Sequence, residues 1–201
     1  ELVIGSNRAK QVNTLHSRHV PIGNYEIEIT LLQHRQCSTS VIRFLDVGKT
    51  QLKKDITSLT GIVRQVILEC QVQFKDRKVQ LKIEGQERQL LLDSQLISHA
   101  ISNLINNALK YSGNRKDPEV IIIYEPDSVQ LKVKDYGIGI PKKDQASLFE
   151  SFSRASNVGD IDGTGLGLVI VKQFIEMHGG TISFQSEVHK GTTFTIAIPN
   201  V

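Results

Sequence analysis

The chain has 201 residues, enough to bury a sizeable core in one large domain or in one medium domain with an appendage. Hydrophobic residues make up 39% and charged residues 22%, which excludes a disordered or fibrous chain. The 24 Lys and Arg against 21 Asp and Glu give a net charge of +3, too balanced for a nucleic-acid or anionic-membrane footprint. We therefore expect no nucleic-acid partner.

Other features of the sequence predict a cytoplasmic domain. The longest strongly apolar run, residues 120–124, is far shorter than a membrane span, and no signal segment opens the chain. The two cysteines, Cys37 and Cys70, have neither metal-ligand spacing nor the density of a disulfide framework, which indicates a reducing compartment. A longer parent protein could still anchor such a domain to a membrane.

The first 46 residues differ from the rest in pattern. Residues 25–31 alternate apolar and polar, as in a half-buried strand, and residues 41–47 form a second apolar segment. We interpret residues 1–46 as an appendage, the remnant of a sensor or of a dimerisation and phosphoacceptor region. Residues 47–201 then form the main domain.

In the main domain, helical and strand patterns follow one another with clear turn signals. Thr57 or Ser58 is expected to cap the first helix and Asp93 the second, which ends near Tyr111. Three long helices with antiparallel strand pairs predict an α+β fold, a two-layer sandwich of a mixed, mostly antiparallel sheet covered on one face by three helices. The expected helices are 59–74, 94–111, a short one at 144–152, and 166–178; the expected strands are 79–83, 90–92, 119–124, 128–134, 181–186 and 192–198.

One face of the second helix carries polar side chains in a line. At ~100° per residue, an apolar stripe faces the core, and His99, Asn103, Asn107 and Lys110 fall together within roughly 80° on the other side. Amide oxygens suit Mg²⁺, and an ammonium suits phosphate. The alternative is an ordinary solvated face, although two Asn in mid-helix weaken that interpretation because Asn prefers caps and turns.

Two glycine-rich segments follow. Asp135 begins an Asp-x-Gly-x-Gly sequence directly after a strand, where Gly137 and Gly139 would let the backbone bring a carboxylate beside a flat ligand; an ordinary strand-to-loop turn is the alternative. Residues 163–167 precede the third long helix, where free N–H groups favour phosphate. This second segment is neither a dinucleotide fingerprint nor a Walker loop, because no strand precedes it and no Gly-Lys-Ser/Thr follows.

Together these segments resemble the ATP-binding catalytic domain of sensor histidine kinases, in the GHKL (Bergerat-fold) superfamily that includes gyrase, the Hsp90 chaperones and MutL. The resemblance covers about residues 50–199, and five blocks in this order make coincidence very improbable. The blocks resemble the family's N box, first glycine box, F box, second glycine box and closing Gly-Thr-x-Phe strand, and they read HAISNLINNALKYS (99–112), DYGIGIP (135–141), LFESFSRAS (148–156), DGTGLGLVIVKQFIEMHGG (162–180) and HKGTTFTIAIP (189–199).

The resemblance implies a site for ATP and Mg²⁺. Asn103, Asn107 and Lys110 would be the catalytic residues, with Asn107 as the metal ligand and Lys110 at a phosphate. Asp135 would accept a hydrogen bond from the adenine amino group, and Thr193 would lie at the back of the adenine pocket. The ATP-binding residues that the resemblance implies are Asn103, Asn107, Lys110, Tyr111, Asp135, Gly137, Ile138, Gly139, Phe152, Arg154, Gly163, Thr164, Gly165, Leu166, Gly167 and Thr193.

The residue at position 103 separates two chemistries. Hydrolysing members of the superfamily carry a Glu there as general base, whereas the amide of Asn103 cannot take a proton from water at neutral pH. The resemblance therefore implies an ATP-dependent protein histidine kinase of a two-component system. It would act as a homodimer and transfer the γ-phosphoryl to a histidine of its own helical hairpin, and then to a response regulator receiver domain. The alternatives are a serine kinase or anti-sigma regulator of the same fold and a non-catalytic nucleotide-binding module.

The expected phosphoacceptor hairpin has no good match. His16 has a proline five residues later but no acidic neighbour, and the interval 22–45 is too short and too strand-like for a second helix. We interpret His16 as an ordinary surface histidine. A chain lacking the hairpin, a degenerate hairpin and a different front module remain the three explanations.

Overall fold

The structure is a computed structural model, and it describes residues 13–22, 25–34, 37–43, 52–74, 76–113, 115–159, 161 and 163–200. The chain divides into two compact units, Glu1–Leu52 and Lys53–Val201. The first unit contains an antiparallel sheet in the order β1-β2-β3, built from β1 (Asn13–Ile22), β2 (Tyr25–His34) and β3 (Cys37–Arg43).

The first unit agrees in part with the sequence pattern. The strand expected at 25–31 lies within β2, and the segment expected at 41–47 overlaps the end of β3, with residues 44–47 outside the described residues. His16 lies in β1, where the backbone is extended, whereas a phosphoacceptor hairpin is helical.

The second unit holds a five-stranded sheet in the order β5-β7-β8-β10-β9. Strands β5 and β7 pair in parallel and the other neighbours pair antiparallel, so the sheet is mixed, as the sequence predicted. A separate two-stranded sheet joins β4 to β6. The elements are β4 (Asp55–Ser58), α1 (Leu59–Gln73), β5 (Gln80–Glu84), β6 (Gln89–Leu92), α2 (Ser94–Ser112), β7 (Glu119–Tyr124), β8 (Ser128–Lys134), α3 (Lys142–Gln145), α4 (Gly167–Met177), β9 (Thr181–Glu187) and β10 (Gly191–Pro199).

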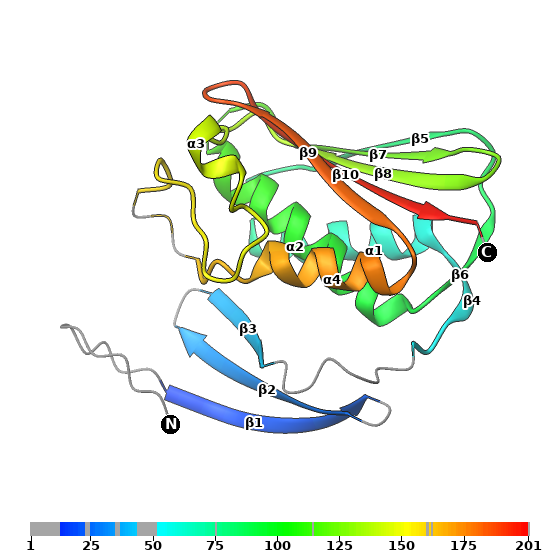
Figure 1. Ribbon diagram of the computed structural model, residues 1–201, viewed down its shortest axis with the longest axis horizontal. Helices are drawn as coiled ribbons and strands as arrows, with labels where there is room; N and C mark the ends of the chain where they lie inside the picture. Colours follow the sequence, from blue (N-terminus) through cyan, green and yellow to red (C-terminus); the bar gives the residue numbers. More distant parts are fainter. Residues whose placement is uncertain are drawn as a thin grey trace. The chain divides into compact units, whose positions relative to one another are not determined.

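The three long helices α1, α2 and α4 cover one face of the five-stranded sheet (Figure 1). Each strand sends every second side chain towards the helices, because side chains alternate along a strand. In β8 these are Val129, Leu131 and Val133, all at most 2% exposed. Burying one such side chain contributes about 1.5–3 kcal/mol, so this layer supplies much of the stability of the unit. Side chains of both layers meet at Leu59, Ile97, Ile101, Val129, Leu131, Ile175, Ile196 and Ile198.

Polar caps begin the first two long helices as the sequence predicted. Ser58 Oγ accepts a hydrogen bond from the N–H of Gly61 at 3.1 Å. Asp93 Oδ1 accepts from two N–H groups of the first turn of α2, each at 3.2 Å. Such caps satisfy N–H groups that have no partner inside the helix, and each typically contributes about 1 kcal/mol.

A buried histidine joins the start of α2 to the end of α4. His178, 2% exposed, accepts the N–H of Asp93 at Nε2 (3.0 Å), and its Nδ1 lies 2.7 Å from the carbonyl oxygen of Phe174. The first contact requires Nε2 to be unprotonated, so Nδ1 carries the proton and donates it to Phe174. Burial lowers the pKa of His178 below its ordinary value of 6.5, which agrees with a neutral ring.

Two local expectations were wrong. The sequence predicted a short helix at 144–152, but α3 ends at Gln145 and turns follow, with N–H groups bonding three residues back and Phe152 at a φ of 64°. The strand β4 was missed, because four residues show no alternation by themselves; its pairing with β6 defines it.

Candidate functional site

The polar line of α2 is half-buried and lies beside the start of α4. Asn103, Asn107 and Lys110 are neither buried nor fully exposed, whereas the apolar stripe of the same helix is buried. Asn103 Nδ2 donates to the carbonyl oxygen of His99 at 3.1 Å. A Cβ at Gly167 would lie 3.2 Å from Asn103 Oδ1, so glycine lets the first residue of α4 approach this amide closely.

The first glycine segment meets the other end of the same line. The N–H of Ile138 donates to the carbonyl oxygen of Tyr111 at 3.3 Å. A Cβ at Gly137 would lie 2.2 Å from that oxygen and 2.9 Å from Asp135 Oδ1, closer than any side chain allows. Gly139 has a φ of 65°, which also favours glycine. The segment therefore passes the end of α2 backbone against backbone at Gly137, a contact that the sequence did not predict.

Asp135 is buried at this end of the site. It is 6% exposed, and its Oδ1 accepts the N–H of Gly137 at 2.8 Å. Burial raises the pKa of the Asp135 carboxyl, and the hydrogen bonds from the backbone of Gly137 and Thr192 oppose that effect. A buried carboxylate with one oxygen held by the backbone can offer its second oxygen to a hydrogen-bond donor of a ligand.

The second glycine segment brings three polar side chains together. A Cβ at Gly163 would lie 3.6 Å from Lys110 Nζ, 3.7 Å from Tyr111 Oη and 4.0 Å from Arg154 Nε. Lys110 Nζ also lies 5.6 Å from the centroid of the Tyr111 ring. Burial raises the pKa of the Tyr111 hydroxyl, so it remains protonated at neutral pH. Two cations and a phenol around one glycine form a surface suited to an anion.

Backbone contacts join the F-box segment to this glycine segment. The N–H of Phe152 donates to the carbonyl oxygen of Gly165 at 3.1 Å, and Arg154 donates through Nη2 to the carbonyl oxygen of Ile161. The Phe152 side chain is 74% exposed. Gly165 has a φ of 72°, and a Cβ there would lie 2.6 Å from the carbonyl carbon of Phe152.

The start of α4 has no side-chain cap. Leu166 precedes the helix without a side-chain cap, and its own N–H donates to Thr164 Oγ1 at 3.4 Å. Helix starts without a cap favour anions, because the unpaired N–H groups point outward and the helix dipole is positive there. Gly167 therefore places this positive end beside the amide of Asn103.

The structure does not bring Thr193 to the site. Strand β10 buries Phe194 and Ile196 on its helix-covered side, so by alternation Thr192 shares that side and Thr193 faces the other. Thr192 is 5% exposed, and its carbonyl oxygen accepts the N–H of Asp135 at 2.8 Å. Thr192, and not Thr193, therefore lies beside Asp135. The period-two alternation of side chains counted back from Phe194 already indicates Thr192 in the sequence. Of the predicted glycines, Gly137, Gly163 and Gly167 approach residues of α2, whereas Gly139 approaches Glu187 and Gly165 approaches Phe152.

Two further residues of the site have no signal in the sequence. Asn157 donates through Nδ2 to the carbonyl oxygen of Gly139 at 2.9 Å, and Arg115 donates to the carbonyl oxygen of Gly137 at 3.1 Å. Both bind backbone atoms of residues 18 to 22 positions away. Such contacts depend on the fold alone, so no residue pattern predicts them.

The donor set suits a magnesium ion held partly by a nucleotide. Among the described residues of the second unit, no group of three or more His, Cys, Asp or Glu could hold a metal. The amide oxygens of Asn103 and Asn107 are of the type that fits Mg²⁺, which keeps most of its ligands as water or phosphate oxygens, and Gly167 leaves Asn103 Oδ1 without a crowding side chain. Within the same described part of the chain, no helix is long and apolar enough to cross a membrane.

Comparison with known proteins identifies the family. Residues 92–201 match the model of the histidine kinase-, DNA gyrase B-, and HSP90-like ATPases, which is more than half of the chain. The chain belongs to this family, and the matched range contains α2, both glycine segments and β10.

Three relatives illustrate the match. The circadian input-output histidine kinase CikA of Synechococcus elongatus is 32% identical over 161 residues, 77% of this chain and 21% of the relative. Sensor protein RprX of Bacteroides fragilis is 34% identical over 173 residues, 82% of this chain and 31% of the relative. The structure of the mycobacterial sensor histidine kinase MprB superposes with a TM-score of 0.63 at 25% identity, covering 73% of this chain and 98% of that one. The chain thus spans between a fifth and a third of these two curated relatives, and the α+β sandwich is confirmed.

Proposed function

We propose that the unit Lys53–Val201 binds Mg-ATP and is the catalytic part of a protein histidine kinase. The observation that carries the proposal is the close approach of both glycine segments to α2: Gly167 lies beside Asn103, Gly163 beside Lys110, and Gly137 beside Tyr111 and the buried Asp135. The site thus offers both kinds of group that a nucleotide needs, a specific polar group for its base and positive charge for its phosphates. Membership of an ATPase family and similarity to sensor histidine kinases support the same conclusion.

The adenine end is formed by Asp135 and Thr192. Asp135 Oδ1 is already held by Gly137, so Oδ2 accepts the exocyclic amino group of adenine. Thr192 lies on the same side of the sheet and closes the pocket behind that carboxylate. Gly137, Ile138 and Gly139 keep the backbone close to the base. A carboxylate that accepts from the amino group selects adenine over guanine, which has a carbonyl oxygen at that position.

The phosphate end is formed by Lys110, Arg154 and the second glycine segment. Lys110 and Arg154 both lie near Gly163 and neutralise phosphate charge. Thr164, Gly165 and Leu166 lead into the uncapped start of α4, whose N–H groups bind phosphate oxygens. Tyr111 lies against the nucleotide, and Phe152 is part of the lid that closes over it.

The metal is held by α2. Asn107 is the proposed ligand through its amide oxygen, with Asn103 one turn earlier near the metal and the phosphates. When bound, Mg²⁺ neutralises charge on the β- and γ-phosphates and orients them. Asn103 lacks the basicity to activate water, so the site protects the γ-phosphoryl from hydrolysis. The phosphoryl is then available to a histidine placed in line with it.

The remaining steps involve other parts of a longer protein and its partners. We propose that the acceptor histidine lies on a phosphoacceptor helical hairpin, that the parent protein acts as a homodimer, and that the phosphoryl passes to a response regulator receiver domain. The catalytic unit would work in the cytoplasm, where ATP and such regulators are found. Similarity to sensor proteins of two-component type supports these steps.

Calorimetric titration of the chain with ATP, with and without Mg²⁺, tests the site. We expect binding that needs Mg²⁺ and that Asn107→Ala largely removes. Asn106→Ala is the matched control, because Asn106 directly precedes Asn107 in α2 but donates through Nδ2 to Ser102 Oγ at 3.2 Å, away from the site. No heat with wild-type chain, or equal loss in both variants, would contradict the proposed site.

Transfer from radiolabelled ATP to an added phosphoacceptor hairpin tests the reaction. We expect an acid-labile, base-stable phosphate, which is characteristic of phosphohistidine. An acid-stable phosphate would instead identify a serine kinase, and retained ATP binding without any transfer would identify a non-catalytic module.

A further inference from the structure

Arg115, in the loop that joins α2 to β7, contacts the first glycine segment. Arg115 Nη1 donates to the carbonyl oxygen of Gly137 at 3.1 Å and to that of His189 at 2.7 Å. His189 belongs to the turn between β9 and β10, so one guanidinium nitrogen binds two segments that are distant in sequence. The two segments also touch directly, because the N–H of His189 donates to the carbonyl oxygen of Ile138 at 2.8 Å.

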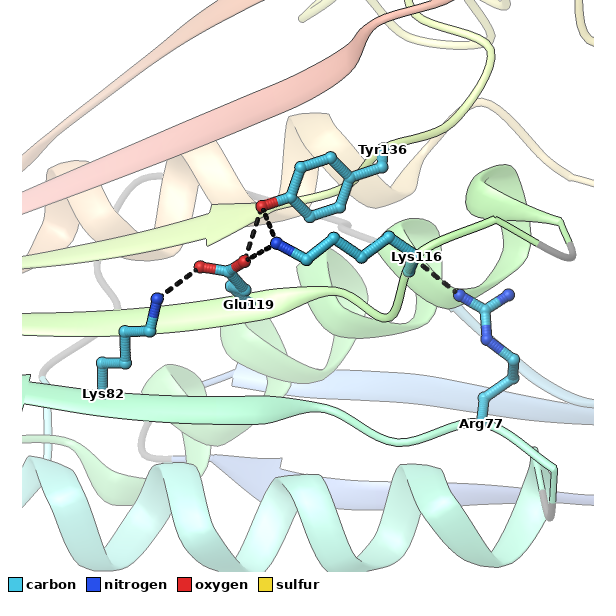
Figure 2. Close-up of polar contacts among 5 residues, drawn as sticks. All are labelled: Arg77, Lys82, Lys116, Glu119 and Tyr136. Atoms are coloured by element: carbon cyan, nitrogen blue, oxygen red, sulfur yellow. Dashed lines mark hydrogen bonds and ion pairs between the residues drawn. The ribbon is translucent and has the colours of Figure 1, made fainter.

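The next residue of the loop is fixed by an ion-pair network behind the same segment (Figure 2). Lys116 Nζ donates to Glu119 Oε1 at 2.6 Å and to Tyr136 Oη at 2.9 Å, and Tyr136 Oη donates to Glu119 Oε1 at 2.5 Å. Lys82 Nζ donates to the other Glu119 oxygen at 2.8 Å, and Arg77 Nη2 donates to the carbonyl oxygen of Lys116 at 3.3 Å. Tyr136 lies between Asp135 and Gly137, so the network anchors both the loop and the glycine segment.

Two members of this network, Glu119 and Lys116, have shifted pKa values. Hydrogen bonds from Lys116, Lys82 and Tyr136 lower the pKa of Glu119 to about 2. Hydrogen bonds to Glu119 and Tyr136 raise the pKa of Lys116 to about 12. The ion pair between Glu119 and Lys116 therefore keeps both charges at the pH values used for nucleotide binding.

Backbone atoms meet without intervening side chains around Asp135. A Cβ at Gly137 would lie 2.2 Å from the carbonyl oxygen of Tyr111, one at Gly139 2.0 Å from that of Glu187, and one at Gly191 2.2 Å from that of Asp135. Because no side chain fills these contacts, the separation of the segments depends on the groups that bind their carbonyls. Arg115 is such a group, and it binds both the glycine segment and the β9–β10 turn.

We propose that Arg115 is a positioning residue for the adenine end of the site: it fixes the distance between the Asp135–Gly139 segment and the β9–β10 turn. Arg115 does not touch the nucleotide. It acts through the backbone that carries Asp135 and Thr192, so its loss widens the adenine end and leaves the phosphate end intact. This inference rests on the proposed nucleotide site.

A second arginine offers a matched control. Arg88 Nη2 also donates to two backbone carbonyl oxygens, that of Ser128 at 2.8 Å and that of Glu125, in the turn between β7 and β8. The turn bound by Arg88 precedes β8, whereas Asp135 follows the last residue of β8. The full length of this seven-residue strand therefore separates the Arg88 contacts from Asp135. Arg88→Ala removes the same kind of contact far from the nucleotide.

The test is calorimetric titration of the whole chain with Mg-ADP and with Mg-ATP. We expect Arg115→Ala to weaken both nucleotides by the same factor, about five- to tenfold, because the adenine end is common to both. Arg115→Lys should recover part of this loss, since an ammonium can still donate to one carbonyl. Lys110→Ala should weaken ATP more than ADP, and Arg88→Ala should leave both affinities unchanged.

The outcomes separate this inference from the proposed function. Wild-type affinity in Arg115→Ala, or equal losses in Arg115→Ala and Arg88→Ala, overturns the positioning role while the nucleotide site stands. A loss that is larger for ATP than for ADP also overturns it, because Arg115 would then act at the phosphates. Should Arg115→Ala fail to fold, Arg115→Lys gives the same comparison. Failure of the wild-type chain to bind nucleotide refutes the proposed function itself.

Discussion

Replacing Asp135 by Asn should separate affinity from stability. An Asn side chain has one acceptor oxygen and one NH₂ group, where the carboxylate has two acceptor oxygens. The N–H of Gly137, 2.8 Å from Oδ1, keeps the single oxygen of the new amide. The NH₂ group then faces the place where the adenine amino group binds, and two donors meet. Asp135→Asn therefore removes the hydrogen bond that recognises the base.

Asp135→Asn should lower the affinity for ATP without lowering the free energy of unfolding. A hydrogen bond to a charged group contributes about 1.5–3 kcal/mol, so the affinity for ATP should fall about 10- to 150-fold. Burial raises the pKa of the Asp135 carboxyl, which means that the folded protein holds this charge at a cost at neutral pH. A neutral amide of the same shape avoids that cost, so the free energy of unfolding should stay equal or increase.

Calorimetry with Mg-ATP and urea unfolding without nucleotide measure these two quantities on the same preparations. Asp144→Asn is a suitable control. Asp144 Oδ2 accepts hydrogen bonds from the N–H and the Oγ of Ser156, both at 2.7 Å, and Asp144 is not one of the proposed nucleotide-binding residues. Unchanged ATP affinity in Asp135→Asn would refute the assignment of the adenine end. A clear loss of stability would refute the claim that the charge is held at a cost.

Three further changes test other parts of the structure. Gly165→Ala should destabilise the fold by about 1–3 kcal/mol in urea unfolding and weaken ATP, because a φ of 72° strains an L-residue and its Cβ would lie 2.6 Å from Phe152; wild-type stability would contradict this. Thr192→Val should weaken ATP while Thr193→Val should not, and the reverse result would restore the sequence-based assignment. His178 is buried and neutral with a lowered pKa, so the unfolded chain takes up a proton at a higher pH than the folded one. The contribution of His178 to stability should be complete above about pH 6.5 and be lost as the pH falls below it. The urea midpoint of wild type should therefore fall more between pH 7.5 and pH 5 than that of His178→Gln, and equal falls would contradict it.

Most of the fold followed from local patterns. The sequence predicted the caps at Ser58 and Asp93 and the alternation in β8, because each of these features depends on residues that are close together in the chain. The strand β4 was missed and the helix at 144–152 was overestimated, since both depend on pairing or packing with distant residues. The roles of residues 1–46 and of the acceptor histidine remain predictions.

The candidate site shows the same division. Helical periodicity predicted that Asn103, Asn107 and Lys110 lie on one side of α2. The two glycine segments indicated places where the backbone lies very close to another group, without saying which group. Only the tertiary structure decided that the glycine segments approach that helix, at Asn103, Lys110 and Tyr111. The physical reason is range: caps and periodicity act within a few residues, whereas the hydrogen bonds of Arg115 and His178 join positions 22 to 85 residues apart. Such contacts exist once the chain has folded and leave no pattern in the sequence.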